Sequence, residues 1–213
     1  MSIKYILFDL DGTLINTNDI IIKCLRDVSI KYANKDLTED ELGVILGKPL
    51  RDQVSLIFNE NIDEMMEHYR INYRANVHGL ILEFEGVAEL LQELYNEGYT
   101  MGIVSSKGRR GINEALKKFH MEKYFKAIVA ANDVENHKPH AEPLEKGLEL
   151  LGASKEEAIF VGDSYFDILC AKNAGVKSVL VDWSILPRCE IMKLNPDYVL
   201  TNSMDFAEIL RGI

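Results

Sequence analysis

The 213-residue chain lacks most features of secreted, membrane and metal-thiolate proteins. Its three cysteines, Cys24, Cys170 and Cys189, form no Cys-x-x-Cys pair, so they indicate neither a disulfide framework nor a zinc site. No apolar run approaches the roughly 18 residues that a membrane-spanning helix needs. The first residues also lack the long apolar stretch and the cleavage site of a secretory signal. We therefore expect a cytoplasmic protein that does not bind membranes.

Basic residues are in the minority, with 24 lysines and arginines against 34 aspartates and glutamates, so the formal net charge is −10. Such a chain is repelled by the phosphates of nucleic acids and by anionic lipids. A small anion can still bind where a few basic side chains converge. We expect no nucleic acid as partner, and a monomer or a homodimer.

Short apolar runs alternate with helical patterns along most of the chain. Several runs are almost continuously apolar or β-branched, which is typical of parallel strands covered by helices on both faces. The runs lie at residues 3–8, 99–104, 127–131, 158–161, 178–181 and 198–200. The helical patterns between them, at 87–97, 143–151 and 165–174, each stop at a glycine. This alternation predicts an α/β fold with a doubly wound parallel sheet, similar to a Rossmann fold.

One connection is much longer than a parallel crossover requires. About 90 residues separate the first two runs, although a crossover needs only a dozen or more. The surplus contains helical patterns at 19–33, 38–46, 50–59 and 63–77, and Thr38 with Glu41 has the spacing of a capping box. We predict an inserted α-helical cap domain at residues 16–80, and a core domain formed by residues 1–15 and 81–213.

Carboxylates gather where predicted strands end, which is where an open α/β sheet binds its ligand. Asp9 and Asp11 follow the first strand, and Asp163 and Asp167 follow the fourth. If these strands are neighbours, each pair of like charges at ~4 Å costs about 4 kcal/mol at an effective dielectric constant near 20. A divalent cation relieves this repulsion, and Mg²⁺ fits oxygen ligands best. For a lone aspartate, a turn or a helix cap remains the simpler interpretation.

Candidate anion-binding groups follow the second and third strands. Ser105 and Ser106 offer hydroxyl and backbone N–H groups at a strand-to-helix turn, and Lys138 is held in extended backbone by Pro139. Taken alone, Lys138 is better interpreted as a solvated loop lysine. Three cations at the start of the next helix oppose its dipole and indicate either a nearby anion or a solvated face: Lys107, Arg109 and Arg110.

Four motifs occur together and in order: FDLDGTLINTN, VSSK, KPHAEP and GDSYFDILCAKNAG. With them the chain resembles, over essentially its whole length, the haloacid dehalogenase-like hydrolase superfamily. It is most similar to the phosphoglycolate-phosphatase-like branch, which includes a bacterial inorganic pyrophosphatase type.

The resemblance implies roles for individual residues. Asp9 is the expected nucleophile that forms an aspartyl-phosphate, and Asp11 the expected general acid and base. Ser105 and Lys138, together with the neighbouring Ser106, are expected to bind the phosphoryl oxygens. The expected Mg²⁺ ligands are Asp9, Asp163 and the carbonyl of Asp11, with Asp167 ligating directly or orienting a ligand.

We therefore predict a Mg²⁺-dependent phosphatase that acts on a small phosphorylated substrate. The phosphoglycolate phosphatase type is the main prediction, and inorganic pyrophosphatase is the alternative. A phosphosugar mutase, a metal-free dehalogenase and a non-enzymatic binding protein are further alternatives. The second carboxylate Asp11 and the GDS segment argue against dehalogenation, which needs neither. Substrate choice is expected to lie in the cap, where Lys48 and Arg51 flank a turn broken by glycine and proline. These two cations either face the substrate or belong to a solvated turn.

Overall fold

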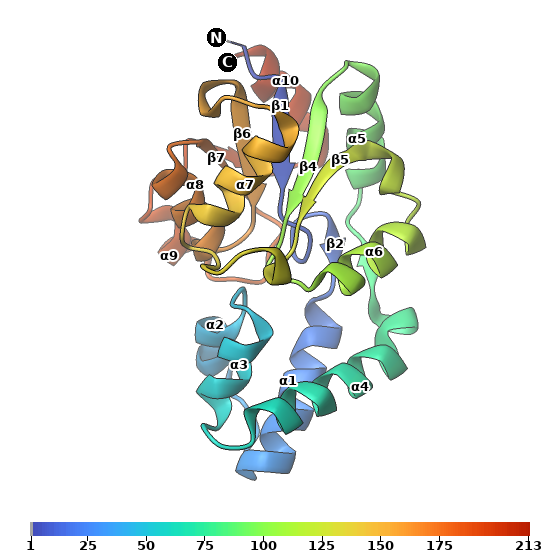
Figure 1. Ribbon diagram of the computed structural model, residues 1–213, viewed down its shortest axis with the longest axis vertical. Coiled ribbons are helices and arrows are strands. Elements are labelled where there is room, and N and C mark those ends of the chain that lie inside the picture. The colour runs from blue at the N-terminus through green and yellow to red at the C-terminus, as the bar shows by residue number, and fades with distance from the viewer. Residues whose placement is uncertain (1) are drawn as a thin grey trace.

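The computed structural model describes residues 2–213, and within this range all side chains except those of Val77, His78 and Met204. It has two parts, an α/β core and a helical cap that lies beyond one end of the sheet (Figure 1). The core sheet has six strands in the order β5-β4-β1-β6-β7-β8. Every neighbouring pair is parallel, so the predicted fold class is confirmed.

Each of the six apolar runs forms one strand of this sheet. The strands are β1 (Tyr5–Phe8), β4 (Thr100–Val104), β5 (Phe125–Val129), β6 (Ala158–Gly162), β7 (Lys177–Val181) and β8 (Tyr198–Leu200). β1 lies between β4 and β6, so the strands that precede Asp9 and Asp163 are neighbours. The order thereby brings the two pairs of predicted carboxylates to the same edge of the sheet.

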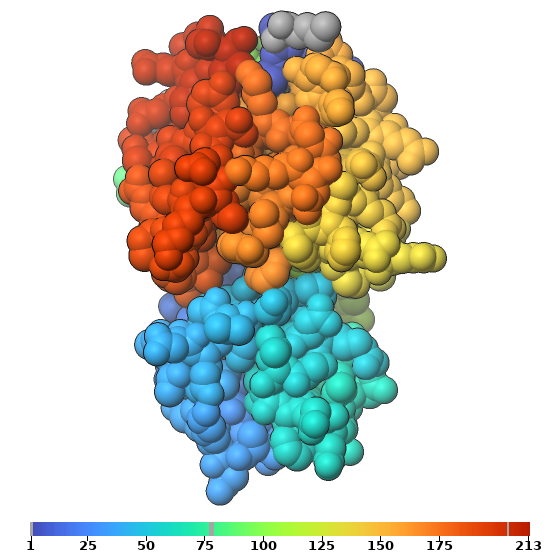
Figure 2. Space-filling view, turned by 90° about the vertical axis from the view of Figure 1, so that its left-hand side faces the viewer, coloured from blue at the N-terminus to red at the C-terminus, as the bar shows by residue number. Residues whose placement is uncertain are grey.

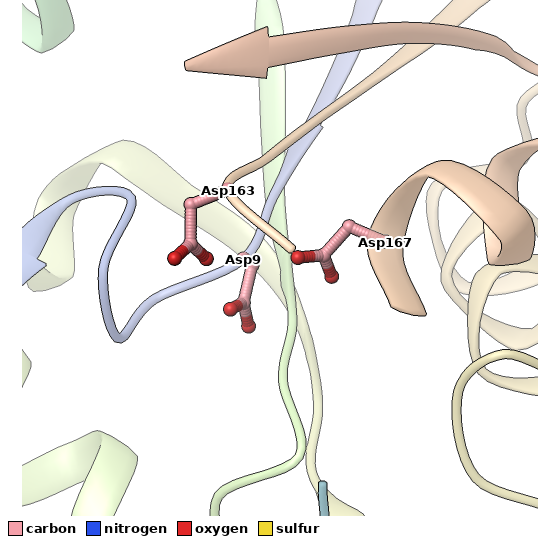
Figure 3. Close-up of side chains that lie close together, drawn as sticks. All are labelled: Asp9, Asp163 and Asp167. Carbon is pink, nitrogen blue, oxygen red and sulfur yellow. The ribbon is translucent and has the colours of Figure 1, made fainter. Parts of the chain in front are cut away.

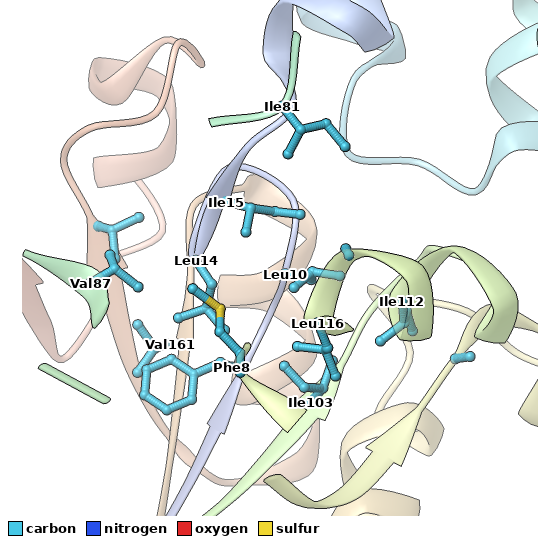
Figure 4. Packing of buried hydrophobic residues seen from close by; sticks show 14 of the residues in the cluster. Phe8, Leu10, Leu14, Ile15, Ile81, Val87, Ile103, Ile112, Leu116 and Val161 are labelled. Atoms are coloured by element: carbon cyan, nitrogen blue, oxygen red, sulfur yellow. The ribbon is translucent and has the colours of Figure 1, made fainter. Parts of the chain in front are cut away.

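The two faces of the sheet bury different side chains because residues alternate along a strand. Ile6 and Phe8 belong to one apolar cluster, shown in part in Figure 4, and Leu7 between them belongs to another. Outside the cap, the helices that contribute buried residues to the first cluster are α5 (Val87–Asn96), α6 (Arg109–Lys118) and α10 (Phe206–Arg211). Helices α7 (Glu142–Leu151) and α8 (Tyr165–Ala174) contribute to the second. The core is therefore a sheet between two helical layers.

The cap consists of four helices and forms a separate lobe below the core (Figure 2). The four helices of the cap are α1 (Asn18–Ala33), α2 (Glu39–Ile45), α3 (Leu50–Ile57) and α4 (Ile62–Leu80). The predicted capping box at Thr38 is present, because its hydroxyl accepts from the Glu41 backbone and the Glu41 carboxylate accepts from the Thr38 backbone. We propose that the cap spans residues 16–80, as the sequence predicts.

Some elements have no counterpart in the sequence patterns. A two-stranded antiparallel ribbon, β2 (Ile15–Asn16) and β3 (Leu82–Glu83), joins the cap to the core. Short helical elements complete the chain: α9 (Arg188–Met192) and the 3₁₀ turns η1 (Glu122–Tyr124), η2 (Ala131–Asp133), η3 (Lys155–Glu157) and η4 (Ser203–Asp205). No helix within residues 2–213 is long and apolar enough to cross a membrane.

Candidate active site

Three buried carboxylates meet beyond the ends of β1 and β6. Asp9 directly follows β1, Asp163 directly follows β6, and Asp167 lies in the first turn of α8. Each offers an oxygen atom, and these atoms all lie within 4.8 Å of one another. Figure 3 shows the three side chains converging from the two strand ends and the helix. This group contains three of the four aspartates that the sequence singled out.

Burial raises the pKa values of two of these carboxylates, Asp9 and Asp163. Burial is the largest cause for Asp9, whose pKa rises to about 6; Lys138 opposes the rise, and the charges of Asp167 and Asp11 add to it. The pKa of Asp163 also lies well above its ordinary range, because of burial and then the charges of Asp167 and Asp9. The protein therefore holds negative charge here at a cost that a cation would reduce.

The donor set fits a hard divalent cation. All ligand atoms in the group are carboxylate oxygens, which Mg²⁺ prefers. Oδ1 of Asp9 is buried and forms no hydrogen bond, although it lies 3.0 Å from the ammonium nitrogen of Lys138. A buried oxygen with spare capacity is what an ion would use.

Lys138 is a buried ammonium rather than a solvated loop lysine, because its side chain is only 3% exposed. Its Nζ donates to Oδ1 of Asp167 at 2.6 Å and to the carbonyl of Val104 at 3.4 Å. Burial opposes its charge, but Asp167 and Asp9 outweigh burial and raise the pKa of Lys138. Lys138 is thus a fixed positive charge beside Asp9.

Asp167 is engaged on both oxygens. Besides accepting from Lys138, it accepts from the backbone N–H and the hydroxyl of Ser164, which forms the capping box of α8. The helix-cap interpretation is therefore correct for this carboxylate, and its charge also orients Lys138. Of the two roles expected for Asp167, the geometry favours orienting over direct ligation.

Asp163 is held by groups that the sequence did not single out. Its Oδ2 accepts from the hydroxyl of Ser184 at 2.7 Å, and its Oδ1 lies 3.4 Å from the hydroxyl of Thr13. Gly12 has a φ of +84°, and a Cβ there would lie 2.3 Å from Oδ2 of Asp163. Any larger residue would displace the carboxylate. Ser184 follows β7, so the rule that sites form at strand ends was the available signal.

Asp11 faces the cap rather than the carboxylate group. Its Oδ1 accepts from the hydroxyl of Thr17 at 2.8 Å, and both its oxygens accept from Nζ of Lys107 at 2.9 Å. Lys107 was ambiguous in the sequence, between an anion partner and a solvated cation. The structure makes it the ion-pair partner of Asp11. The two aspartates of the DxD motif therefore lie in different surroundings.

The two serines after β4, Ser105 and Ser106, differ in their hydrogen bonding. The hydroxyl oxygen of Ser105 accepts from the backbone N–H of Lys107 at 3.3 Å, and the buried Oγ of Ser106 has no hydrogen-bond partner. Both line the same cavity as Asp9 and Asp11. Their hydroxyl groups are available to an anion that enters it.

A cavity of about 1060 Å³ lies between the core and the cap. Asp9, Asp11 and Asp163 line it from the core, and Lys48 and Arg51 line it from the cap. Lys48 lies over the ring of Phe166, with its Nζ 4.4 Å from the ring centre, while Arg51 pairs with Asp63 of α4. The structure thus brings the two predicted cap cations to the cavity, although Arg51 already has an acidic partner.

The family model for haloacid dehalogenase-like hydrolases matches residues 6–181. The chain belongs to this family. The predicted resemblance is therefore confirmed, and so is the assignment as an enzyme. The hydrolase is 41% identical to Pyrophosphatase PpaX of Anoxybacillus flavithermus over 210 residues, covering 99% of this chain and 98% of that one. It is 42% identical to Pyrophosphatase PpaX of Bacillus mycoides over 214 residues, covering 100% and 99% of the two chains.

Solved structures agree with the fold of the hydrolase. A haloacid dehalogenase-like hydrolase from Bacteroides fragilis superposes with a TM-score of 0.87 at 25% identity, covering 94% of this chain and 98% of that one. A protein from Haemophilus somnus described as a predicted phosphoglycolate phosphatase superposes with a TM-score of 0.86 at 23% identity, covering 98% of each chain. The second likeness bears on the fold alone.

Proposed function

We propose that the hydrolase is a Mg²⁺-dependent inorganic pyrophosphatase that acts through an aspartyl-phosphate on Asp9. The observation that carries the choice of substrate is the 41–42% identity, over the whole chain, to proteins named pyrophosphatase. Phosphoglycolate phosphatase, our first prediction from the sequence, is named only among structures of lower identity such as the Haemophilus somnus protein at 23%. The alternative from the sequence therefore becomes the main proposal.

Asp9 is the group proposed to attack the phosphoryl group. One of its carboxylate oxygens forms a bond to phosphorus while the bond from phosphorus to the leaving oxygen breaks. Lys138, fixed beside Asp9 by Asp167, is a cation suited to neutralise the oxygens of the transferred group. The hydroxyl groups of Ser105 and Ser106 are suited to donate hydrogen bonds to the same oxygens.

Asp11 is the group proposed to move protons. In the first step, its carboxylic acid donates a proton to the leaving phosphate. In the second step, its carboxylate takes a proton from the water that attacks the aspartyl-phosphate, which releases phosphate and restores Asp9. This role is supported by the position of Asp11, which lines the cavity and does not belong to the buried carboxylate group.

Asp9 and Asp163 would hold the Mg²⁺ ion, together with the carbonyl of Asp11 that the family resemblance implies. When bound, this ion supplies charge neutralisation to the phosphoryl oxygens. Ser184, Thr13 and Gly12 keep the Asp163 carboxylate in place for that purpose.

A substrate panel tests the proposal. Phosphate release would be measured with Mg²⁺ on pyrophosphate, phosphoglycolate, sugar phosphates, nucleotides and nitrophenyl phosphate, with Asp9→Asn as the background control. We expect kcat/KM for pyrophosphate to exceed that for every other substrate by at least about tenfold, which corresponds to ~1.4 kcal/mol. A higher kcat/KM for phosphoglycolate would overturn the proposal in favour of the phosphoglycolate phosphatase type.

A further inference from the structure

The ammonium group of Lys107 lies where the core meets the cap. Besides both oxygens of Asp11, its Nζ donates to the hydroxyl oxygen of Tyr73 on α4 at 3.0 Å. Nζ also lies 4.8 Å from the centre of the Tyr73 ring. One cation of the core thus contacts the proposed proton donor and a helix of the cap at the same time.

The surroundings hold this ammonium firmly in its charged form. The side chain of Lys107 is 14% exposed. Burial opposes its charge, but Asp11 and Tyr73 outweigh burial and raise its pKa. Burial also raises the pKa of Tyr73, which keeps its hydroxyl protonated and able to accept from the lysine. Tyr73 is itself supported by the buried ring of Tyr69, stacked at 6.0 Å between ring centres.

Lys107 lies closer to the expected position of the leaving group than to that of the transferred phosphoryl group. Lys138 is the cation beside the nucleophile Asp9, whereas Lys107 contacts only the proton donor Asp11 of this pair. A leaving oxygen that receives a proton from Asp11 must come within hydrogen-bond distance of its carboxyl group. The ammonium 2.9 Å from both Asp11 oxygens is then adjacent to that leaving group.

Three other cations that line the cavity are less suited to this role. Arg51, Arg109 and Arg110 pair with Asp63, Asp133 and Glu114, and the side chain of Arg110 is 73% exposed. Exposed charges gain little from pairing, because water and salt screen them. A desolvated cation such as Lys107 discriminates more strongly between an anionic and an uncharged leaving group.

We propose that Lys107 is the specificity-determining cation that binds the anionic leaving group, and that Tyr73 positions it from the cap. The proposal rests on the proposed function, for which the leaving group is a phosphate. The two phosphates of pyrophosphate are then divided between two lysines, Lys138 for the transferred group and Lys107 for the leaving group.

The test compares two substrates in matched variants at equal free Mg²⁺. We expect Lys107→Met to lower kcat/KM for pyrophosphate by roughly 10- to 150-fold more than for nitrophenyl phosphate, which carries no second anion. Lys107→Arg keeps the charge and is expected to retain most of the preference. Tyr73→Phe removes only the hydroxyl and is expected to lower the preference by a few fold. Arg110→Met, which removes an exposed cation of the same cavity, is the control and is expected to leave the ratio within about twofold.

A measurement without turnover separates binding from proton transfer. Methylenediphosphonate carries two phosphonate groups and cannot be hydrolysed, while orthophosphate carries one anionic centre. We expect Lys107→Met, in the presence of Mg²⁺, to weaken binding of methylenediphosphonate by at least about tenfold more than binding of orthophosphate, measured by calorimetry. Equal weakening of both, together with an unchanged ratio of kcat/KM values, would show that Lys107 acts only through Asp11 and would overturn the proposal.

Failure of this proposal and failure of the proposed function give different results. If the wild-type protein prefers phosphoglycolate, the pyrophosphatase assignment fails. The same comparison then uses phosphoglycolate against nitrophenyl phosphate, because its leaving group carries a carboxylate. A preference that does not depend on Lys107 overturns the role of the lysine whichever substrate is best.

Discussion

Replacement of Lys138 by methionine would remove a positive charge that balances two buried carboxylates, Asp9 and Asp167. In the part of the chain that the structure describes, no other cation pairs with either of them. Nζ of Lys138 lies 2.6 Å from Asp167 and 3.0 Å from Asp9, and Asp167 is fully buried. Removing one partner of a buried pair costs about 3–5 kcal/mol, because the other charge is left unpaired. For a chain of this size, 1 kcal/mol corresponds to ~2–4 °C in melting temperature. We therefore expect Lys138→Met to melt about 6–20 °C below the wild type in EDTA.

Two further variants separate charge from packing. Lys193→Met removes a lysine that pairs with Glu190 while 68% of its side chain is exposed, and we expect its melting temperature to change by less than about 4 °C. Lys138→Met combined with Asp167→Asn also removes one of the two carboxylate charges left unpaired, so we expect stability to recover in part. Activity should stay at least ~10²-fold below the wild type in both Lys138 variants, because the cation beside the nucleophile is missing. A double variant no more stable than Lys138→Met would refute the charge argument.

The remaining predictions concern the metal, the DxD motif and the cap. In thermal unfolding, Mg²⁺ at 100 times its dissociation constant stabilises by about 2.7 kcal/mol, so we expect a rise of roughly 5–11 °C that Asp163→Asn abolishes. The metal assignment would be contradicted if Mg²⁺ raised the melting temperature of Asp163→Asn as much as that of the wild type. Full activity of the wild type after dialysis against EDTA would contradict it too. We expect Asp9→Asn to show no turnover, and its acid-quenched samples to contain no phosphoenzyme. We expect turnover by Asp11→Asn to be at least ~10²-fold slower than by the wild type. Phosphate trapped on a residue other than Asp9 would refute the nucleophile. Arg51 is 56% exposed and paired with Asp63, and Lys48 lies over the ring of Phe166. We therefore expect Arg51→Ala and Lys48→Ala to lower kcat/KM for the best anionic substrate by no more than about tenfold. Losses as large as those of Lys107→Met would place the second anion at the cap turn instead.

The strands and most helices were predictable because each carries a local signal. The buried strands are nearly continuous in apolar residues, and Gly152 and Gly175 end their helices in the left-handed conformation, as expected of glycine. The ribbon of β2 and β3 was missed because two residues are too short for a periodic pattern. The strand predicted at 127–131 begins instead at Phe125 and ends at Val129, on an edge strand whose pairing with β4 is irregular.

The partners of the site residues were harder to predict than the residues themselves. Asp9 and Asp163 follow strands that the sequence marks clearly, so their types and positions indicate chemistry at once. By contrast, the Lys107–Asp11 and Ser184–Asp163 contacts join residues 96 and 21 positions apart. Such contacts depend on the strand order and on where the cap lies, which no local pattern contains.

The ribbon between cap and core has a consequence for how such a protein can be altered. Asn16 lies opposite Leu82 and Ile15 opposite Glu83, so the cap leaves and re-enters the core at adjacent points. The cap is therefore an insertion whose two ends join the core at one place on its surface. A segment joined in this way behaves as an exchangeable module, because its replacement leaves the ends that the core must connect unchanged. Lineages, or protein engineers, can thus change which molecules reach the reacting carboxylate while keeping the sheet that presents it.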